Sequence, residues 1–225
     1  MLPLIQNLQH RRALDAIDDA FAGPNEAPAC ATGCDACCHG PFDVSSSDLW
    51  SLLEALVELE LGVRGDALRR IKAAARVQRG HLAWTQEACP SLETVGEDAF
   101  DAMCDALVEA PCPLLVDNRC AVYASRPEPC RFRGRVWRDN DEELDMDCPV
   151  GLNDHLQTLE VPYLDLAETL ARVESRSRGA VNGRVERTSI ALGLDHLLRS
   201  RGSTKRPSTA QSDATPVPET SESAS

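Results

Sequence analysis

Residues 30–40 read Cys30-Ala-Thr-Gly-Cys34-Asp-Ala-Cys37-Cys38-His39-Gly40, a loop in which four thiols fall within nine residues. A Cys-x2-Cys pair such as Cys34 and Cys37 is the usual half of a tetrahedral thiolate site, because two intervening residues let both sulfurs face one ion. We therefore expect this loop to contribute half of a metal site around which the rest of the chain folds.

A second group of cysteines lies further along the chain and comes from different elements. Residues 114–123 contain turn formers between two short apolar runs and predict a β-hairpin that carries Cys120. The next stretch, which carries Cys130, contains Pro127 and Pro129, and we expect it to be irregular. The two groups together predict that separate segments converge on metal. The expected ligands are Cys30, Cys34, Cys37, Cys38, Cys112, Cys120, Cys130 and Cys148.

The compartment decides how the ten cysteines are interpreted. The first residues lack the basic region and the apolar stretch of a signal peptide. No run approaches the roughly eighteen apolar residues that a membrane span requires. We therefore expect a cytoplasmic protein. In a reducing compartment, clustered thiols are typical of metal ligands or redox groups and not of structural disulfides.

Composition favours a mainly α fold. Hydrophobic residues make up 43% of the 225 residues and aromatic residues only 4%, so Ala and Leu must supply most of the core. We expect one domain over 1–200, with the cysteine motifs at 30–150 forming a metal core between helices, and a disordered tail at 201–225 that is rich in Ser, Thr and Pro. The expected helices are 4–21, 49–61 ended by Gly62, 66–86, 97–109, 163–177 and 186–200. A further strand is expected at 135–137, followed by an acidic turn at 139–143.

Several short motifs occur in order between residues 30 and 150. They are the adjacent Cys37-Cys38, a Ser-x-Asp helix start at 46–48, Cys112-Pro-Leu-Leu, Cys120-Ala-Val-Tyr, Arg126-Pro and Cys130-Arg131. This order resembles the CxxCxxCC family, whose members are described as carrying a zinc- or iron-chelating domain. The resemblance implies metal binding by the shared cysteines. A similar cluster in flagellin lysine methylases implies that an iron–sulfur site can occur on this scaffold. The chain departs from the family pattern in having three residues, not two, between Cys30 and Cys34.

Other residues near the motifs are weighed by their position. Cys104 shares the apolar face of an expected helix and Cys89 precedes a proline at a helix end, so we expect both to be structural. His39 could replace a thiolate, but a position outside the ligand set is the simpler interpretation. Four thiolates on one dication leave a net charge of about −2. We expect Arg126 and Arg131 to offset it and to donate hydrogen bonds to sulfur.

The net charge and the absence of a β/α repeat argue against two other functions, nucleic-acid binding and radical-SAM chemistry. The net charge of −13 argues against nucleic acid as the main partner, because duplex binding needs a basic face. The Cys30-x3-Cys34-x2-Cys37 spacing is also that of radical-SAM loops, but no alternating β/α pattern follows it.

The leading function is metal binding, with Zn²⁺ and an iron–sulfur cluster both open and [4Fe-4S] the favoured cluster type. The alternatives are an iron–sulfur enzyme of methyl or electron transfer and a structural zinc module for protein interaction. Enzymatic activity and a protein partner stay open.

Overall fold

The computed structural model describes residues 4–20, 34–133, 136–139, 142–145 and 187–202, and this part of the chain is mostly helical. The helices are α1 (Leu4–Ala20), α2 (Ser46–Glu58), α3 (Leu61–His81), α4 (Leu92–Val95), α5 (Glu97–Ala106), α6 (Glu128–Phe132) and α8 (Ile190–Gly202), with a 3-10 turn, η1, at Tyr123–Ser125. Three antiparallel two-stranded ribbons join β1 (Asp43–Val44) to β6 (Thr188–Ser189), β2 (Leu115–Val116) to β3 (Arg119–Cys120), and β4 (Val136–Asp139) to β5 (Glu142–Asp145).

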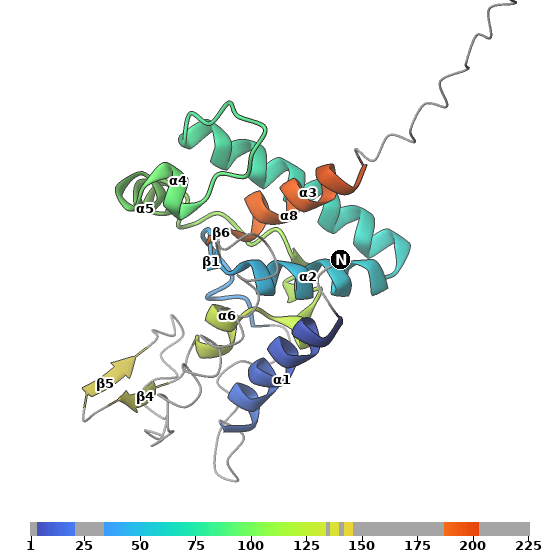
Figure 1. Ribbon diagram of the computed structural model, residues 1–225, viewed down its shortest axis with the longest axis vertical. Helices are drawn as coiled ribbons and strands as arrows, with labels where there is room; N and C mark the ends of the chain where they lie inside the picture. The colour runs from blue at the N-terminus through green and yellow to red at the C-terminus, as the bar shows by residue number, and fades with distance from the viewer. Residues whose placement is uncertain (1–3, 21–33, 134–135, 140–141, 146–186, 203–225) are drawn as a thin grey trace, which may run out of the picture.

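Helix α2 forms the centre of the hydrophobic core. Its apolar residues Leu49, Leu52, Leu53 and Leu56 recur at helical spacing, and each is at most 5% exposed. They pack with residues of α3, of α8 and of the segments that follow α5. Eight of the thirteen residues of α2 are buried, and the helix lies among the other elements (Figure 1).

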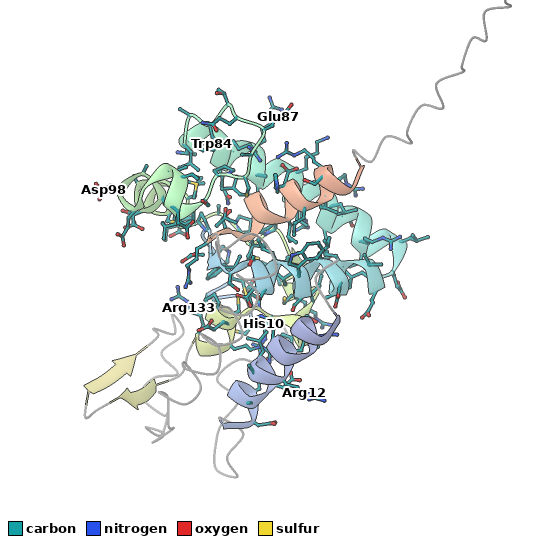
Figure 2. All side chains as sticks on the ribbon, viewed as in Figure 1. His10, Arg12, Trp84, Glu87, Asp98 and Arg133 are labelled. Carbon is teal, nitrogen blue, oxygen red and sulfur yellow. The ribbon has the colours of Figure 1, made fainter. Side chains whose placement is uncertain are left out.

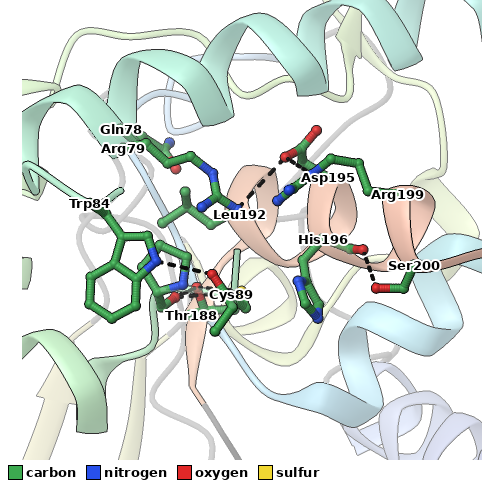
Figure 3. Close-up of polar contacts among 12 residues, drawn as sticks. Gln78, Arg79, Trp84, Cys89, Thr188, Leu192, Asp195, His196, Arg199 and Ser200 are labelled. Carbon is green, nitrogen blue, oxygen red and sulfur yellow. Dashed lines mark hydrogen bonds and ion pairs between the residues drawn. The ribbon is translucent and has the colours of Figure 1, made fainter. Parts of the chain in front are cut away.

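Helices α3 and α8 lie side by side and close the core (Figure 1). At Gly193 of α8, an added Cβ would stand 2.3 Å from Leu49 Cδ1, so this contact leaves no room for a side chain. At the outer edge of the pair, Asp195 lies 3.8 Å from Arg79 and accepts a hydrogen bond of 2.9 Å from Arg199 (Figure 3). The helix expected at 186–200 therefore exists, but it starts at Ile190 because residues 188–189 pair with β1.

The start of α2 is organised by a buried carboxylate. Ser45 and Asp48 form a capping box, in which Ser45 Oγ accepts from the Asp48 amide and the Asp48 carboxylate accepts from the Ser45 amide at 3.2 Å. The other oxygen, Asp48 Oδ1, accepts from His10 Nε2 of α1 at 3.0 Å and from the Glu128 amide of α6 at 3.2 Å. One carboxylate, 1% exposed, thus ties three helices together.

The helix boundaries around Gly62 differ from expectation. Helix α2 ends at Glu58 and α3 already begins at Leu61, so Gly62 lies inside a first helical turn and does not end α2. The break comes from Leu59 and Glu60, whose ψ angles of 150° and 145° are extended. The helices expected at 66–86 and 97–109 end earlier than expected, at His81 in α3 and at Ala106 in α5.

The expected hairpin is confirmed, and its turn chemistry explains its register. Leu115 pairs with Cys120 and Val116 with Arg119 across the two-residue turn. Asp117 and Asn118 have φ angles of 50° and 58°, the left-handed values that a type I′ turn requires. Asp and Asn tolerate this conformation better than other residues with a side chain.

The stretch after the hairpin, expected to be irregular, is helical. Residues 128–132 form the short helix α6, because Pro127 and Pro129 occupy its N-terminal cap and first turn, where no amide donor is needed. The strand expected at 135–137 is confirmed as β4, which begins at Val136 and extends to Asp139. It pairs antiparallel with β5, so residues 139, 142 and 143 of the expected acidic turn belong to strands.

Some expectations concern residues that the structure does not describe. They are the helix at 163–177, Cys30 and Cys148, and the tail from residue 203 onward; residues 201–202 belong to α8. In the described ranges, no helix is long and apolar enough to cross a membrane.

Removal of the Asp48 carboxylate should destabilise the protein strongly. Asp48→Ala leaves His10 Nε2 and the Glu128 amide without their acceptor, so we expect a loss of about 3 kcal/mol in the free energy of unfolding. Asp66→Ala, which removes an exposed pair with Arg69, should cost less than about 1 kcal/mol. Urea unfolding followed by circular dichroism measures both, and equal losses would contradict the assigned role.

The pKa of Asp48 predicts how the stability lost in the Asp48→Ala variant changes with pH. Burial alone raises the pKa of Asp48, but the hydrogen bonds from His10 and from Ser45 and Glu128 outweigh it and hold the pKa below its usual value. The carboxylate therefore contributes its stability above about pH 4 and loses it as the pH falls through the lowered pKa. The difference in the free energy of unfolding between wild type and Asp48→Ala should therefore become smaller below about pH 4.

Candidate metal centre

Six cysteines surround one cavity of about 60 Å³. Phe42, Leu114, Val122 and Ile190 supply apolar parts of its wall. The structure therefore places on one cavity six of the eight cysteines expected from sequence to bind metal, and the other two lie outside the described residues. The six are Cys34, Cys37, Cys38, Cys112, Cys120 and Cys130.

Backbone hydrogen bonds join the first cysteine segment to the second. The Cys112 amide donates to the Cys38 carbonyl at 2.8 Å, and the Gly40 amide donates to the Ala110 carbonyl at 2.7 Å. Gly40 has φ +85°, and an added Cβ would meet the Val108 carbonyl oxygen at 3.4 Å, so glycine suits this close approach. This ladder sets the cysteines at 38 and 112 side by side.

The ladder also explains the position of His39. It pairs with Pro111 across the ladder and does not line the cavity. The interpretation of His39 as a substitute ligand is therefore not supported by its position.

Cys120 and Cys130 reach the cavity on separate elements. The β2–β3 hairpin carries Cys120, and the Ala121 amide donates to the Leu114 carbonyl at 2.9 Å beside it. Helix α6 carries Cys130, and its first amide is held by Asp48. The position of Cys130 thus depends on a contact far from the cysteine in sequence.

The thiols of the cavity differ in acidity. The hydrogen bond between the two neighbouring side chains lowers the pKa of Cys37 to about 6, helped by the positive charges of Arg133 and Arg126, and it raises the pKa of Cys38. Burial raises the pKa of Cys112 to about 12. Burial and the nearby thiols at 112 and 120 likewise raise the pKa of Cys130.

Two arginines lie at the cavity with buried donors. Arg126 is 7% exposed, and its guanidinium carbon lies 3.9 Å from the centre of the Tyr123 ring. Arg133, labelled in Figure 2, lies 5.8 Å from the Phe42 ring centre. The Nε atoms of both arginines are buried and have no hydrogen-bond partner among the described residues, although both side chains line the cavity.

The structure gives Arg131 a different role from the expected one. Its guanidinium donates to the Leu14 carbonyl at 3.1 Å and to the Asp18 carboxylate, both on α1, and its Nε donates to the Arg126 carbonyl at 2.9 Å. Arg131 is not part of the cavity lining. It fixes α6 against α1, whereas Arg133, two residues later, lines the cavity together with the thiols. Helix α6 ends at Phe132, so the extended backbone at Arg133 redirects the chain.

The two cysteines expected to be structural lie elsewhere. Cys89 Sγ lies 3.8 Å from Thr188 Oγ1, in the cluster of polar contacts beside α3 and α8 (Figure 3). Cys104 packs on the cluster around Phe100 and Met103. Neither lines the cavity. The described ranges contain eight cysteines, and no disulfide joins any two of them.

The side chains at the cavity are chemically suited to bind a metal through thiolates. In the described part of the chain, no three His, Cys, Asp or Glu side chains stand close enough to hold one ion together. The six thiols nevertheless share one cavity, and thiolate is a ligand that both zinc and iron–sulfur iron accept. The buried Nε donors of Arg126 and Arg133 fit an anionic centre, since a buried donor without an acceptor is costly.

Comparison with protein families agrees with this donor set. The family model described as "CxxCxxCC: Putative zinc- or iron-chelating domain" matches residues 29–149, more than half of the chain. The chain belongs to this family. The CxxCxxCC match contains all eight expected ligands, including the two outside the described residues. No curated protein and no solved structure matches the chain.

The acidities of the CxxCxxCC thiols predict selective alkylation. In chelator-treated, metal-free protein at pH 7, Cys37 should react with iodoacetamide about tenfold or more faster than Cys112, because the thiolate is the reactive form. Cys104, half-buried like Cys37 but with its pKa raised to about 11 by burial, is the matched control and should also react slowly. Peptide mass spectrometry at timed intervals measures the rates. Similar rates at Cys37 and Cys104 would show that the Cys37 thiol is not acidified.

Proposed function

We propose that this protein binds a thiolate-ligated zinc or iron centre in the cysteine cavity, in a reducing compartment such as the cytoplasm. The observation that supports it most is that thiols from the loop at 34–38, the ladder, the hairpin and α6 all line one small cavity. These thiols are half-buried and come from separate segments, which is the arrangement expected of ligands that share one metal centre. The proposed donors are Cys34, Cys37, Cys38, Cys112, Cys120 and Cys130, with Cys30 and Cys148 as further donors.

An iron–sulfur cluster is the form of the centre that we favour. One tetrahedral zinc ion and one iron–sulfur cluster each use four thiolates, so the six thiols that line the cavity suffice for either. The cavity volume of about 60 Å³ exceeds the roughly 10–15 Å³ that one water-sized probe needs, and this favours the bulkier cluster. A cluster supplies one-electron chemistry when bound. The residues around it would hold it, exclude water with apolar side chains and balance its charge.

A structural zinc site is the second candidate. The Cys34-x2-Cys37 spacing is typical of half of a tetrahedral zinc site, and zinc would then act by fixing the loop against the ladder. An iron–sulfur centre would instead favour an electron- or methyl-transfer role, while zinc would favour an interaction module.

Anaerobic purification with elemental analysis separates these candidates. A brown protein that contains iron and acid-labile sulfide supports the cluster. A colourless protein with stoichiometric zinc supports the second candidate. A correctly folded protein that retains and takes up neither metal would overturn the proposed function.

The proposed donors predict unequal effects of two serine substitutions. Cys130→Ser removes a thiol at the cavity and should lower bound metal strongly, because oxygen is a poorer ligand for these soft sites. Cys104→Ser, on α5, should keep its metal and lose only modest packing stability. Metal analysis and limited proteolysis of both variants provide the measurement. Equal metal content in wild type and Cys130→Ser would remove Cys130 from the donor set.

The positive charge of Arg133 at the cavity should raise the affinity of the site for metal. Arg133→Gln should lower the affinity for Co²⁺, used as a spectroscopic probe, by about tenfold, because residues that donate to metal ligands typically contribute this much. Arg133→Lys should recover part of the loss. Arg69→Gln, which lies on exposed α3 surface, is the control and should match wild type. Titration of the thiolate-to-cobalt absorption band measures the affinity, and a Gln variant with wild-type affinity would exclude the proposed contribution.

A further inference from the structure

A second and larger pocket lies beside the cysteine cavity. It has a volume of about 380 Å³ and is bounded by α3, the segment at 107–113, the chain at 40–42 and the start of α8. This volume is within the roughly 300–1,000 Å³ of small-molecule sites and too small for a protein domain. The proposed metal site does not use this space.

The wall of the pocket is apolar because α3 presents small side chains to it. Ala73, Ala74 and Val77 line it from α3, and Leu107 and Pro111 line it from the facing segment. Val77 is 50% exposed at this wall although it is a large apolar residue. Water in such a hollow finds few polar partners, so an apolar ligand that displaces it gains free energy.

One charged residue lies among these apolar groups. Arg70 is the one Asp, Glu, Lys or Arg side chain in the described lining, in a protein of net charge −13. Its Nη1 donates to the Leu115 carbonyl, which holds the guanidinium at the pocket. Arginine carries five N–H donors, so others are available for a planar anionic group. The pocket thus combines an apolar body with a single positive group.

The pocket and the cysteine cavity share a wall. Phe42, Cys112 and Ile190 line both. The backbone ladder at 38–40 and 110–112 runs between the two spaces. A molecule in the larger pocket would therefore lie next to a thiol that borders the metal cavity.

We propose that this pocket binds a small organic anion, with a flat apolar body against α3 and a carboxylate or sulfonate paired with Arg70. The pocket is a ligand site next to the cysteine cavity, and binding at it does not depend on which metal the cavity holds. Only the position of this ligand beside a bound metal rests on the proposed function.

Fluorescent probes test the site on the full-length protein as purified. Anilinonaphthalene sulfonate has an apolar body and an anionic group, and neutral phenylnaphthylamine has the apolar body alone. We expect saturable binding of the sulfonate at one site per chain. Ala73→Leu, which fills the pocket from an exposed helix position, should weaken both probes about tenfold. Arg70→Gln should weaken the anionic probe about tenfold and leave the neutral probe nearly unchanged.

Matched variants on nearby surfaces serve as controls. Arg76→Gln removes an exposed arginine of α3 that does not line the pocket, and Ala102→Leu adds the same bulk on α5. Both should bind the probes like wild type, and circular dichroism checks that every variant folds. Non-saturable binding, or Ala73→Leu with wild-type affinity in a folded protein, overturns the site. If Arg70→Gln lowers the affinity for both probes equally, the proposed preference for an anion is wrong.

A metal readout keeps this proposal separate from the proposed function. Metal content is measured in each variant alongside probe binding. One-site probe binding that responds to Ala73→Leu in a protein without metal supports the pocket and contradicts the metal centre. Bound metal without specific probe binding supports the centre and contradicts the pocket.

Discussion

The buried carboxylate of Asp48 is the contact on which the arrangement of the cysteines depends. It accepts hydrogen bonds from the cap of α2, from His10 of α1 and from the first amide of α6. A charged group is stable at such depth only when its lone pairs are satisfied, so the three elements must meet at one point. Helix α6, with five residues, is too short to be stable alone and takes its position from this contact and from the hydrogen bonds of Arg131 to α1. Cys130 faces the other thiols as a result.

The cavity contains groups with opposite effects on the pKa values of its thiols. Apolar walls raise the pKa of the deepest thiols, whereas metal ligation needs thiolates. The guanidinium groups of Arg126 and Arg133 reduce this conflict, because they favour negative charge on the sulfurs. A divalent or polynuclear metal would complete the balance. The protein as a whole is acidic, so these local cations stand out from the overall charge.

Features that depend on neighbouring residues in the chain could be predicted from the sequence. The hairpin at β2–β3 follows from Asp117 and Asn118, and the Ser-x-Asp motif marks the start of α2. The thiol spacing also indicated which cysteines would share a cavity. Features that depend on distant contacts could not be predicted. Nothing in the spacing of Arg131 and Arg133 indicates that one turns to α1 and the other to the cavity, since this depends on where a five-residue helix ends.

The backbone ladder between Cys38 and Cys112 bears on how a metal in the proposed site would exchange. Because peptide groups join the two cysteine segments, these thiols stay neighbours whether or not an ion lies between them. The chain entropy that a zinc finger must give up on loading is here already lost during folding. Loading and release can then proceed without unfolding, at rates set by access to the cavity and by thiolate exchange.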